Sequence, residues 1–251
     1  DNVMMAAVFA DGTTIIESAA AEPEVEDLAM FLNSLGAKIE GAGTRKIVIH
    51  GVESLTGADH EVIPDRIEAG TFMIAGMIAG DGVVLENVRS EHLTALIDSL
   101  RGSGHRVDLK DDAKIIVSAS SDPKANELTT EPYPGFPTDM QAQMCALYAT
   151  TPGISVITET VFPNRFMHVS ELKRMGANIN LKDSMAVIRG VDQLSAAPVM
   201  ASDLRASAAL ILAALGADGT TEINRLYHID RGYENIDQKL RSLGAELQRS
   251  K

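Results

Sequence analysis

The chain repeats itself four times, with a period of about 70 residues. In each copy an apolar, helix-like segment ends at a glycine, and a β-rich run follows. These glycines lie 66 to 71 residues apart, at Gly12, Gly82, Gly153 and Gly219. A second set recurs every 68 to 72 residues, at Gly36, Gly104, Gly176 and Gly244. Two sets of markers with matching periods predict one α/β building block that is used four times.

The second copy predicts the order of elements within one block. Asp65 and Ser90 stand directly before apolar residues at helical spacing, in the N-cap position that both residue types favour. β-branched runs predict the strands. In chain order we expect a strand at 60–64, a helix from 65 to the turn at 80–82, a strand at 83–88, a helix from 90, and strands at 105–109 and 114–119 turned by Asp111-Asp112. The predicted block is β-α-β-α-β-β.

The two outer copies are predicted to be incomplete. The chain begins inside the helix of the first copy, which therefore lacks its opening strand. It ends soon after Glu246-Leu247, so the last copy is expected to lack its closing strand. Because unpaired strand edges are a liability, we expect partner strands from further residues or from another chain. Asp1 is not an initiator methionine, which indicates a processed chain or a fragment.

Composition excludes several classes of function. The net charge of −13 argues against general affinity for nucleic acid or acidic membranes, which requires an excess of Lys and Arg. No apolar run approaches the roughly 18 residues of a membrane span, and the start has no basic region typical of a signal peptide. The single cysteine, Cys145, rules out an internal disulfide and fits a reducing compartment. We therefore expect a cytoplasmic protein.

Arginines recur where the predicted helices begin. Helix N-termini expose free backbone N–H groups and a partial positive charge, and neighbouring guanidinium groups add paired donors suited to phosphate and carboxylate. If the copies pack side by side, these helix starts converge on one face. The pattern then predicts an anion-binding concavity lined by Arg66, Arg165, Arg205 and Arg231.

Each of these residues also has a simpler structural interpretation. Asp65, Asp139 and Asp203 all occupy N-cap positions, and capping is a sufficient role for any of them. A general base would need a neighbouring hydroxyl to deprotonate, and the local sequence does not identify which group that would be. An arginine taken alone is more often a surface or ion-pair residue.

Other polar candidates are equally open. Glu22 and Glu24 flank Pro23 at a helix start, where carboxylates favour the helix dipole. Cys145 lies on an apolar helix face and is expected to pack as a small apolar residue. The six histidines show no metal-ligand spacing, although His168 and His228 stand near the arginine turns as candidate donors behind them. We predict no metal and no cofactor.

Six segments make the chain similar to a known family. It resembles the C-terminal three-fifths of the UDP-N-acetylglucosamine enolpyruvyl (1-carboxyvinyl) transferases. The segments are EPEVEDLAMFLNSLGAKIEG, VIPDRIEAGTF, FPTDMQAQ, TETVFPNRFMHVSELKRMGA, ASDLRASAAL and YHIDRGYENIDQKLRSLGA. The resemblance implies an inside-out α/β barrel, with three such blocks in each of two domains. Residues 1–62 would be the last block of the first domain, and residues 63–251 the second domain minus one strand.

The family moves the enolpyruvyl group of phosphoenolpyruvate to the 3-hydroxyl of UDP-N-acetylglucosamine and releases phosphate, the first committed step of peptidoglycan precursor synthesis. The resemblance implies that Asp139 is the general base and that Arg205 and Arg231 hold phosphoenolpyruvate as catalytic residues. It implies that Val161 contacts the nucleotide sugar through its backbone and that Arg66 lies at the hinge. The remaining residues implied in substrate binding are Asp203, Leu204, Arg165, Glu24 and Glu22.

The chain also departs from the family. The family's Lys-Asn pair near the N-terminus and its mobile loop with a cysteine or aspartate acid are not found in this sequence, and Cys145 does not match the loop cysteine. We therefore expect no turnover by this chain alone, and a further partner in the N-terminal segment of the family. Two alternatives stay open: a non-catalytic fragment or anion-binding module with the same fold, and an EPSP-synthase-like transferase acting on a shikimate substrate.

Overall fold

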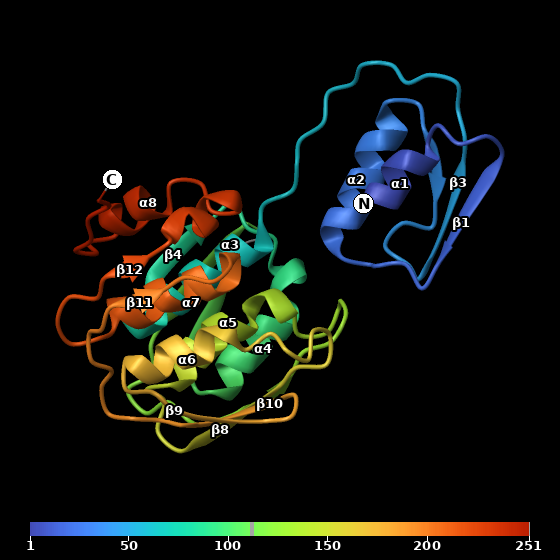
Figure 1. Cartoon of the computed structure of the whole chain (residues 1–251). Helices are drawn as coiled ribbons and strands as arrows, with labels where there is room; N and C mark the ends of the chain where they lie inside the picture. The colour runs from blue at the N-terminus through green and yellow to red at the C-terminus, as the bar shows by residue number, and fades with distance from the viewer. Residues whose placement is uncertain (111–112, 251) are drawn as a thin grey trace. The chain divides into compact units, whose positions relative to one another are not determined.

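The computed structural model describes residues 1–110 and 113–250, so the turn predicted at Asp111-Asp112 lies outside the described residues. The chain divides into two compact units, each described here by itself (Figure 1). Unit 1 comprises Asp1–Pro64 with Pro132–Gly135, and unit 2 comprises Asp65–Glu131 with Phe136–Lys251. Each unit has its own cluster of buried apolar residues. That these units are parts of two domains of one kind stays a prediction.

Unit 1 contains the first copy of the repeat. Its elements are α1 (Asn2–Ala7), β1 (Thr13–Glu17), α2 (Pro23–Ser34), β2 (Lys38–Glu40) and β3 (Lys46–His50). The strands form an antiparallel sheet in the order β1-β3-β2. Met4, Val25 and Ile49 are among the ten residues of its core. The order α-β-α-β-β agrees with the predicted block without its opening strand.

The third copy shows the whole block. Its elements are β7 (Glu127–Thr129), the 3-10 turn η2 (Thr138–Met140), α5 (Gln141–Tyr148), β8 (Ile154–Thr158), α6 (Met167–Arg174), β9 (Asn178–Lys182) and β10 (Met185–Arg189). The sheet order is β7-β8-β10-β9, with β7 parallel to β8 and the other pairs antiparallel. The predicted β-α-β-α-β-β order is confirmed here.

The second copy departs from the prediction at its opening strand. Its elements are α3 (Arg66–Ile78), β4 (Val83–Glu86), η1 (Ser90–Leu93), α4 (Thr94–Gly102), β5 (Arg106–Lys110) and β6 (Lys114–Ser118). Residues 60–64 form no strand. His60 instead lies 3.0 Å from an Asp27 carboxylate oxygen and 5.2 Å, centroid to centroid, from the ring of Phe31. The predicted strand is therefore wrong, and its first residue contacts the first copy's helix α2 instead of pairing in a sheet.

The start of the second helix in this copy is also different. Asp65 caps α3 as predicted, but Ser90 is not a cap. The chain first makes the 3-10 turn η1, and α4 starts four residues later, at Thr94. The apolar face itself is confirmed, because Leu93, Leu96 and Leu100 are buried.

The fourth copy is shorter than expected. It contains β11 (Val199–Met200), α7 (Leu204–Leu215), β12 (Ile223–Asn224), η3 (Leu226–Arg231) and α8 (Ile236–Ser242). β11 and β12 pair in parallel, and no further strand pairs with them in the described part of the chain. The prediction that only the closing strand is missing is wrong, since 245–250 is also without regular structure. A strand needs a neighbour for its backbone hydrogen bonds, and the partner within this block is not formed.

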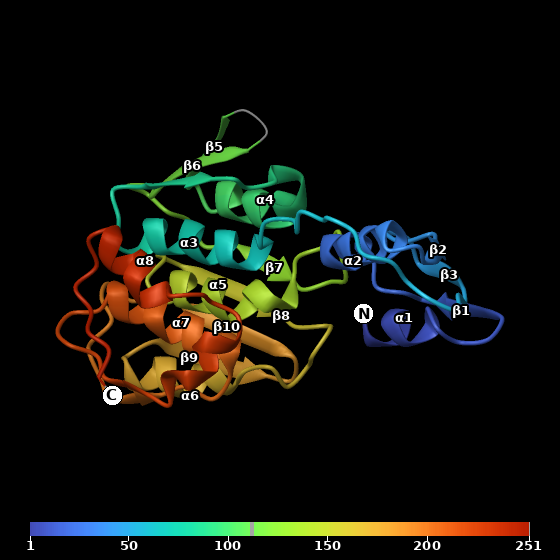
Figure 2. The same ribbon diagram turned by 90° about the horizontal axis from the view of Figure 1, so that it is seen from above.

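Three helices fill the centre of unit 2. α3, α5 and α7 contact one another, and Figure 2 shows them in the middle with strands and the outer helices α4 and α6 around them. All eight residues of α5 are buried, as is the alanine-rich stretch from Ala206 to Ala213 of α7. Small side chains allow the helix backbones to approach closely. The predicted inside-out arrangement, with helices within and sheets outside, is therefore confirmed.

The marker glycines recur for a backbone reason. All eight have a positive φ, between +85° and +126°. Gly82 shows the constraint most clearly, since its φ is +126° and a Cβ there would lie 2.6 Å from the carbonyl oxygen of Val117. Residues with side chains rarely adopt this conformation. The repeat seen in the sequence therefore marks the turns that end each helix.

Candidate functional site

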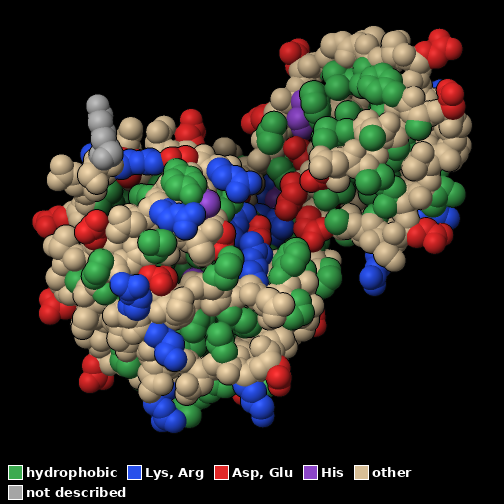
Figure 3. Space-filling view, in the orientation of Figure 1, with side chains coloured by type: hydrophobic (Ala, Val, Ile, Leu, Met, Phe, Trp, Pro, Cys, Tyr) green, Lys and Arg blue, Asp and Glu red, His purple; other side chains and the backbone are tan. Residues whose placement is uncertain are grey.

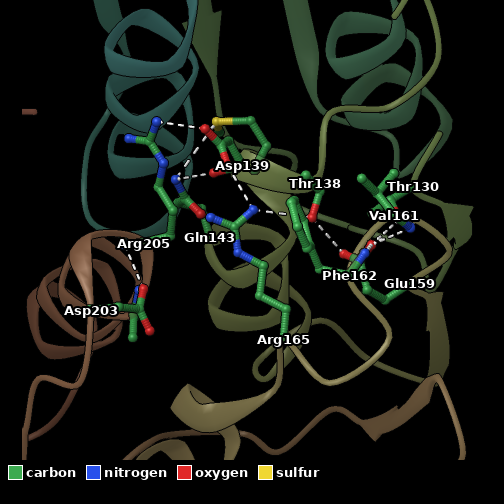
Figure 4. A network of polar contacts seen from close by, with 12 residues as sticks. Thr130, Thr138, Asp139, Gln143, Glu159, Val161, Phe162, Arg165, Asp203 and Arg205 are labelled. Atoms are coloured by element: carbon green, nitrogen blue, oxygen red, sulfur yellow. Dashed lines mark hydrogen bonds and ion pairs between the residues drawn. The ribbon is translucent and has the colours of Figure 1, made fainter. Parts of the chain in front are cut away.

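Asp139 lies between two arginines in unit 2. It belongs to the turn η2, directly before helix α5. One carboxylate oxygen, Oδ1, accepts a hydrogen bond from Arg165 Nη1 at 2.6 Å, and Oδ2 accepts one from Arg205 Nη2 at 2.7 Å (Figure 4). Arg165 comes from the loop between β8 and α6, and Arg205 from the first turn of α7. The third and fourth copies thus meet at this carboxylate.

The three aspartates that share a place in the repeat have different roles. The Asp65 carboxylate accepts hydrogen bonds from the backbone N–H groups of Ile67 and Glu68. Asp203 caps α7 in the same way, accepting from Arg205 N and Ala206 N, both at 2.9 Å. Neither η2 nor α5 has such a side-chain cap. Capping therefore accounts for the first two aspartates but not for Asp139.

The two arginines determine the charge state of Asp139. Burial by itself raises the pKa of this carboxyl, but the charges and hydrogen bonds of Arg205 and Arg165 outweigh it, so the pKa lies below the usual value. The group is therefore ionised at neutral pH. The Asp139 side chain is 36% exposed, whereas that of Arg205 is only 14% exposed. A ligand from solvent can therefore reach the Asp139 carboxylate before it reaches the Arg205 guanidinium.

Arg205 is held by Tyr233, a residue that no sequence pattern indicated. The guanidinium carbon lies 5.7 Å from the centre of the Tyr233 ring, a cation–π contact. The Tyr233 hydroxyl is 2.8 Å from Thr71 Oγ1 on α3, and Gln143 Nε2 on α5 donates to it at 3.4 Å. Gln143 also donates to the backbone oxygen of Asp139 at 2.9 Å. This buried polar cluster links all three central helices to the Asp139–Arg205 pair.

A second unpredicted residue, Glu159, follows strand β8 and is fully buried. Its Oε1 accepts hydrogen bonds from the backbone N–H groups of Val161 and Phe162 at 2.8 and 2.9 Å. Its Oε2 accepts one from the Thr138 hydroxyl at 2.8 Å. The Val161 N–H is thus occupied within the protein. Glu159 stands inside the segment TETVFPNR, but a lone glutamate after a strand gives no signal of burial.

The other predicted site residues in unit 2 are Arg231, Arg66 and Leu204, and in the described part of the chain none of them forms an ion pair with Asp139. Arg231 is exposed at the end of η3, and its side chain has no ion pair within the described ranges. Arg66 is half-buried at the start of α3. Leu204 begins α7, with its side chain close to Gly232. Glu22 and Glu24 stand at the start of α2 in unit 1.

Cys145 and the two histidines have structural surroundings. Cys145 is fully buried in α5, and this burial raises the pKa of its thiol, as expected for a packing residue. His168 is buried on α6, where desolvation lowers its pKa to about 4, so it is neutral at pH 7. The ring of His228 lies 4.3 Å from that of Tyr227. Within residues 1–110 and 113–250, neither His168 nor His228 forms a hydrogen bond with Arg165 or Arg205, and their role as donors behind the arginines stays a prediction.

Part of the surface of unit 2 is locally basic. Figure 3 shows several Lys and Arg side chains close together on the visible face of unit 2, although the net charge of the chain is −13.

Within residues 1–110 and 113–250 no group of three or more His, Cys, Asp or Glu is arranged to hold a metal ion. No helix in the same ranges has the length and apolar character to cross a membrane.

Comparison with known proteins gives consistent relatives. Over 250 residues the chain is 64% identical to the UDP-N-acetylglucosamine 1-carboxyvinyltransferase of Akkermansia muciniphila, covering 99% of this chain and 59% of that protein. It is 57% identical to the UDP-N-acetylglucosamine 1-carboxyvinyltransferase 2 of Carboxydothermus hydrogenoformans and 55% identical to the enzyme of Methylacidiphilum infernorum, with similar coverage. The chain therefore spans about three-fifths of the length of these relatives.

Solved structures show the same fold. The enolpyruvyl transferase NikO from Streptomyces tendae superposes with a TM-score of 0.85 at 31% identity, covering 96% of this chain and 57% of NikO. EPSP synthase from Acinetobacter baumannii gives a TM-score of 0.74 at 19% identity, over 99% of this chain and 60% of that one, which supports the fold alone. Residues 1–240 match the profile of the family described as EPSP synthase (3-phosphoshikimate 1-carboxyvinyltransferase). The chain therefore belongs to the EPSP synthase family.

Proposed function

We propose that this chain carries the base and the cationic residues of an enzyme that transfers the enolpyruvyl group of phosphoenolpyruvate to the 3-hydroxyl of UDP-N-acetylglucosamine. The observation that supports this most directly is the Asp139 carboxylate between Arg165 and Arg205. It places an ionised base beside two cations. Relatives at 55% to 64% identity are named for this nucleotide sugar. The reaction belongs to peptidoglycan and cell-wall synthesis, and we propose the cytoplasm as its location.

The proposed reaction is an addition followed by an elimination. Asp139 accepts the proton of the sugar 3-hydroxyl while the oxygen forms a bond to C2 of phosphoenolpyruvate, and C3 gains a proton from the acid that the family carries on its mobile loop. That acid then takes a proton back from C3, which re-forms the double bond as the C2–O bond to phosphate breaks and inorganic phosphate leaves. Arg205 and Arg231 hold the phosphate and carboxylate of phosphoenolpyruvate, because planar guanidinium groups offer paired donors to both anions.

The ion pairs couple anion binding to the strength of the base. Phosphoenolpyruvate bound to Arg205, and substrate bound to Arg165, compete with Asp139 for the same guanidinium donors. Once those donors turn to the ligand, Asp139 loses the interactions that lower its pKa and regains a free lone pair. A carboxylate with a higher pKa is a stronger base. Binding of the first substrate thus prepares Asp139 for the hydroxyl of the second.

The other proposed binding residues extend the site. We assign substrate binding to Val161 through its backbone carbonyl, since its N–H is bonded to Glu159. Asp203 supports Arg205 by capping α7. The remaining assignments rest on the family resemblance alone and concern Leu204, Arg66, Glu22 and Glu24.

A second candidate function is an anion-binding module without turnover. The observation that favours it is length, because the chain spans 59% of the Akkermansia muciniphila relative. Without a positioned general acid, a reaction of this kind loses about 10² to 10⁴-fold in rate. For this reason we expect no turnover by the chain alone.

Release of inorganic phosphate from phosphoenolpyruvate and UDP-N-acetylglucosamine tests both candidates. The chain is assayed alone and with a separately supplied segment of the Akkermansia muciniphila enzyme that covers the rest of its length. Activity only in the mixture, lost in Asp139→Asn, supports the transferase. A well-folded chain that binds phosphoenolpyruvate but releases no phosphate in the mixture supports the binding module. Activity with shikimate 3-phosphate in place of the nucleotide sugar contradicts the proposed acceptor.

A further inference from the structure

We propose that Glu159 is a positioning residue that holds Arg165 in place against Asp139, acting through the Thr138 hydroxyl and through the loop of residues 160–165. The proposal rests on the proposed function, which makes Asp139 the base. It adds to that function the group that orients the base and its cation.

Glu159 is a buried carboxylate whose hydrogen bonds all come from neutral groups. Thr130 Oγ1 donates to its Oε1 at 2.6 Å, in addition to the two backbone N–H groups and the Thr138 hydroxyl. It has no ion pair in the part of the chain that the structure describes. A buried carboxylate is costly to the fold unless several donors meet it. One of these donors, the Thr138 hydroxyl, belongs to the residue directly before Asp139.

The first connection from Glu159 to the base is one hydroxyl. Thr138 Oγ1 donates its proton to Glu159 Oε2, so its lone pairs face the other way. Arg165 Nη1 donates to Thr138 Oγ1 at 3.1 Å and to Asp139 Oδ1 at 2.6 Å. Figure 4 shows the row Glu159, Thr138, Arg165 and Asp139. The carboxylate thus makes the Thr138 hydroxyl an acceptor for the guanidinium.

The second connection is the loop that carries the arginine. Glu159 Oε1 binds the backbone N–H of Phe162, and the guanidinium carbon of Arg165 lies 5.5 Å from the centre of the Phe162 ring. A cation over an aromatic face is attracted by it. Glu159 therefore fixes the position of two groups that contact the Arg165 guanidinium, the Phe162 ring and the Thr138 hydroxyl. Two independent contacts on one guanidinium favour positioning over a chance contact.

Several charged groups surround Asp139 and must be accounted for in a titration. Arg165 and Arg205 contact it directly. Tyr233 contacts Arg205 from the other side, and His168 on α6 interacts electrostatically with Asp203 and Arg165. His168 stays neutral until about pH 4. A His168→Leu background removes the titration of His168 from the Asp139 profile.

The test follows the Asp139 carboxyl by carbon NMR in chain labelled at aspartate, with Asp139→Asn to assign the signal. Thr138→Val removes the hydroxyl without changing any charge, and Thr138→Ser keeps it. Glu159→Gln presents an amide N–H to Thr138, which turns the hydroxyl proton towards Arg165. Thr130→Val is the matched control, because Thr130 contacts Glu159 but not Arg165.

We expect the titration midpoint of Asp139 to move up in Thr138→Val and in Glu159→Gln, and to stay unchanged in Thr138→Ser. The direction in Glu159→Gln is decisive, because removal of a nearby negative charge by itself would move the midpoint down. Thr130→Val is expected to shift it less than Thr138→Val. An unchanged midpoint in folded Thr138→Val, or a fall in folded Glu159→Gln, overturns the proposal. If Glu159→Gln does not fold, the comparison of the Asp139 midpoint in Thr138→Val and Thr138→Ser tests the proposal.

This measurement needs no turnover, so it separates the two proposals. A raised midpoint in a chain that never releases phosphate, alone or complemented, keeps the positioning role and rejects the transferase. Phosphate release together with an unchanged midpoint keeps the transferase and rejects the positioning role of Glu159.

Discussion

Asp139 and Arg205 lie 66 positions apart in the chain, and their side chains meet at 2.7 Å. Each stands at the start of a central helix, one in the third copy of the repeat and one in the fourth. Because α5 and α7 pack against each other, the two helix starts become neighbours. The repeat thus brings a base and a cation together that no local sequence pattern connects.

The substitution Asp139→Asn is expected to strengthen phosphoenolpyruvate binding. It leaves Arg165 and Arg205 without a competing carboxylate, and it removes a negative charge that repels the ligand. We expect the dissociation constant for phosphoenolpyruvate to fall about tenfold at low salt, equivalent to about 1.4 kcal/mol, and the gain to shrink as ionic strength rises. Isothermal titration calorimetry of the chain measures both.

The matched control for this binding experiment is Asp65→Asn, which changes the same charge at a helix start that has no arginine pair of this kind. It is expected to leave the dissociation constant nearly unchanged. If Asp139→Asn bound phosphoenolpyruvate more weakly than the unchanged chain, the competition between Asp139 and the ligand would be wrong.

Loss of the Tyr233 hydroxyl is expected to destabilise unit 2. Tyr233→Phe keeps the ring beneath Arg205 but removes the buried partner of Thr71 and Gln143. A buried donor left without its partner costs about 1–3 kcal/mol. Denaturant unfolding measures the change. Tyr227→Phe serves as the control, because that hydroxyl is on an exposed side chain and accepts a hydrogen bond from Arg225. An equal loss in both variants would argue against the buried cluster.

His168 is expected to make stability depend on pH in mild acid. Burial lowers the pKa of His168 to about 4, against 6.5 for the free side chain. As pH falls below 6.5 the unfolded chain binds a proton that the folded chain does not, so stability falls from pH 6.5 to about 4 and then levels off for this group. The loss approaches about 3 kcal/mol. His168→Leu should flatten this part of the stability profile, and an unchanged slope would exclude His168 as its source.

Unit 1 is expected to open more readily than the third copy. Its core has ten buried apolar residues, and Val3, Phe9 and Met30 on its surface are each at least 59% exposed. A block of this size buries too little apolar surface for high stability. Hydrogen exchange should therefore be faster across residues 1–60 than across 127–192. Equal protection of the two segments would contradict this prediction.

Much of the architecture was predictable because its causes are local. The marker glycines recur since the turns after each helix need a positive φ, and the apolar spacing of α3 and α4 already indicates their buried faces. The caps formed by Asp65 and Asp203 depend on backbone groups two and three residues away. Such features are present in the order of the residues.

The repeat, the order of elements in the third copy and the caps formed by Asp65 and Asp203 therefore follow from the order of the residues alone. Packing between distant segments was needed to establish that residues 60–64 form no strand, that Asp139 binds arginines instead of capping a helix, and that Glu159 and Tyr233 contact the residues around it. The two kinds of feature differ in how far apart their interacting groups lie in the sequence. A cap or a glycine turn is satisfied by neighbours in the chain, whereas a strand edge, a buried carboxylate and an ion pair need partners that packing alone brings near.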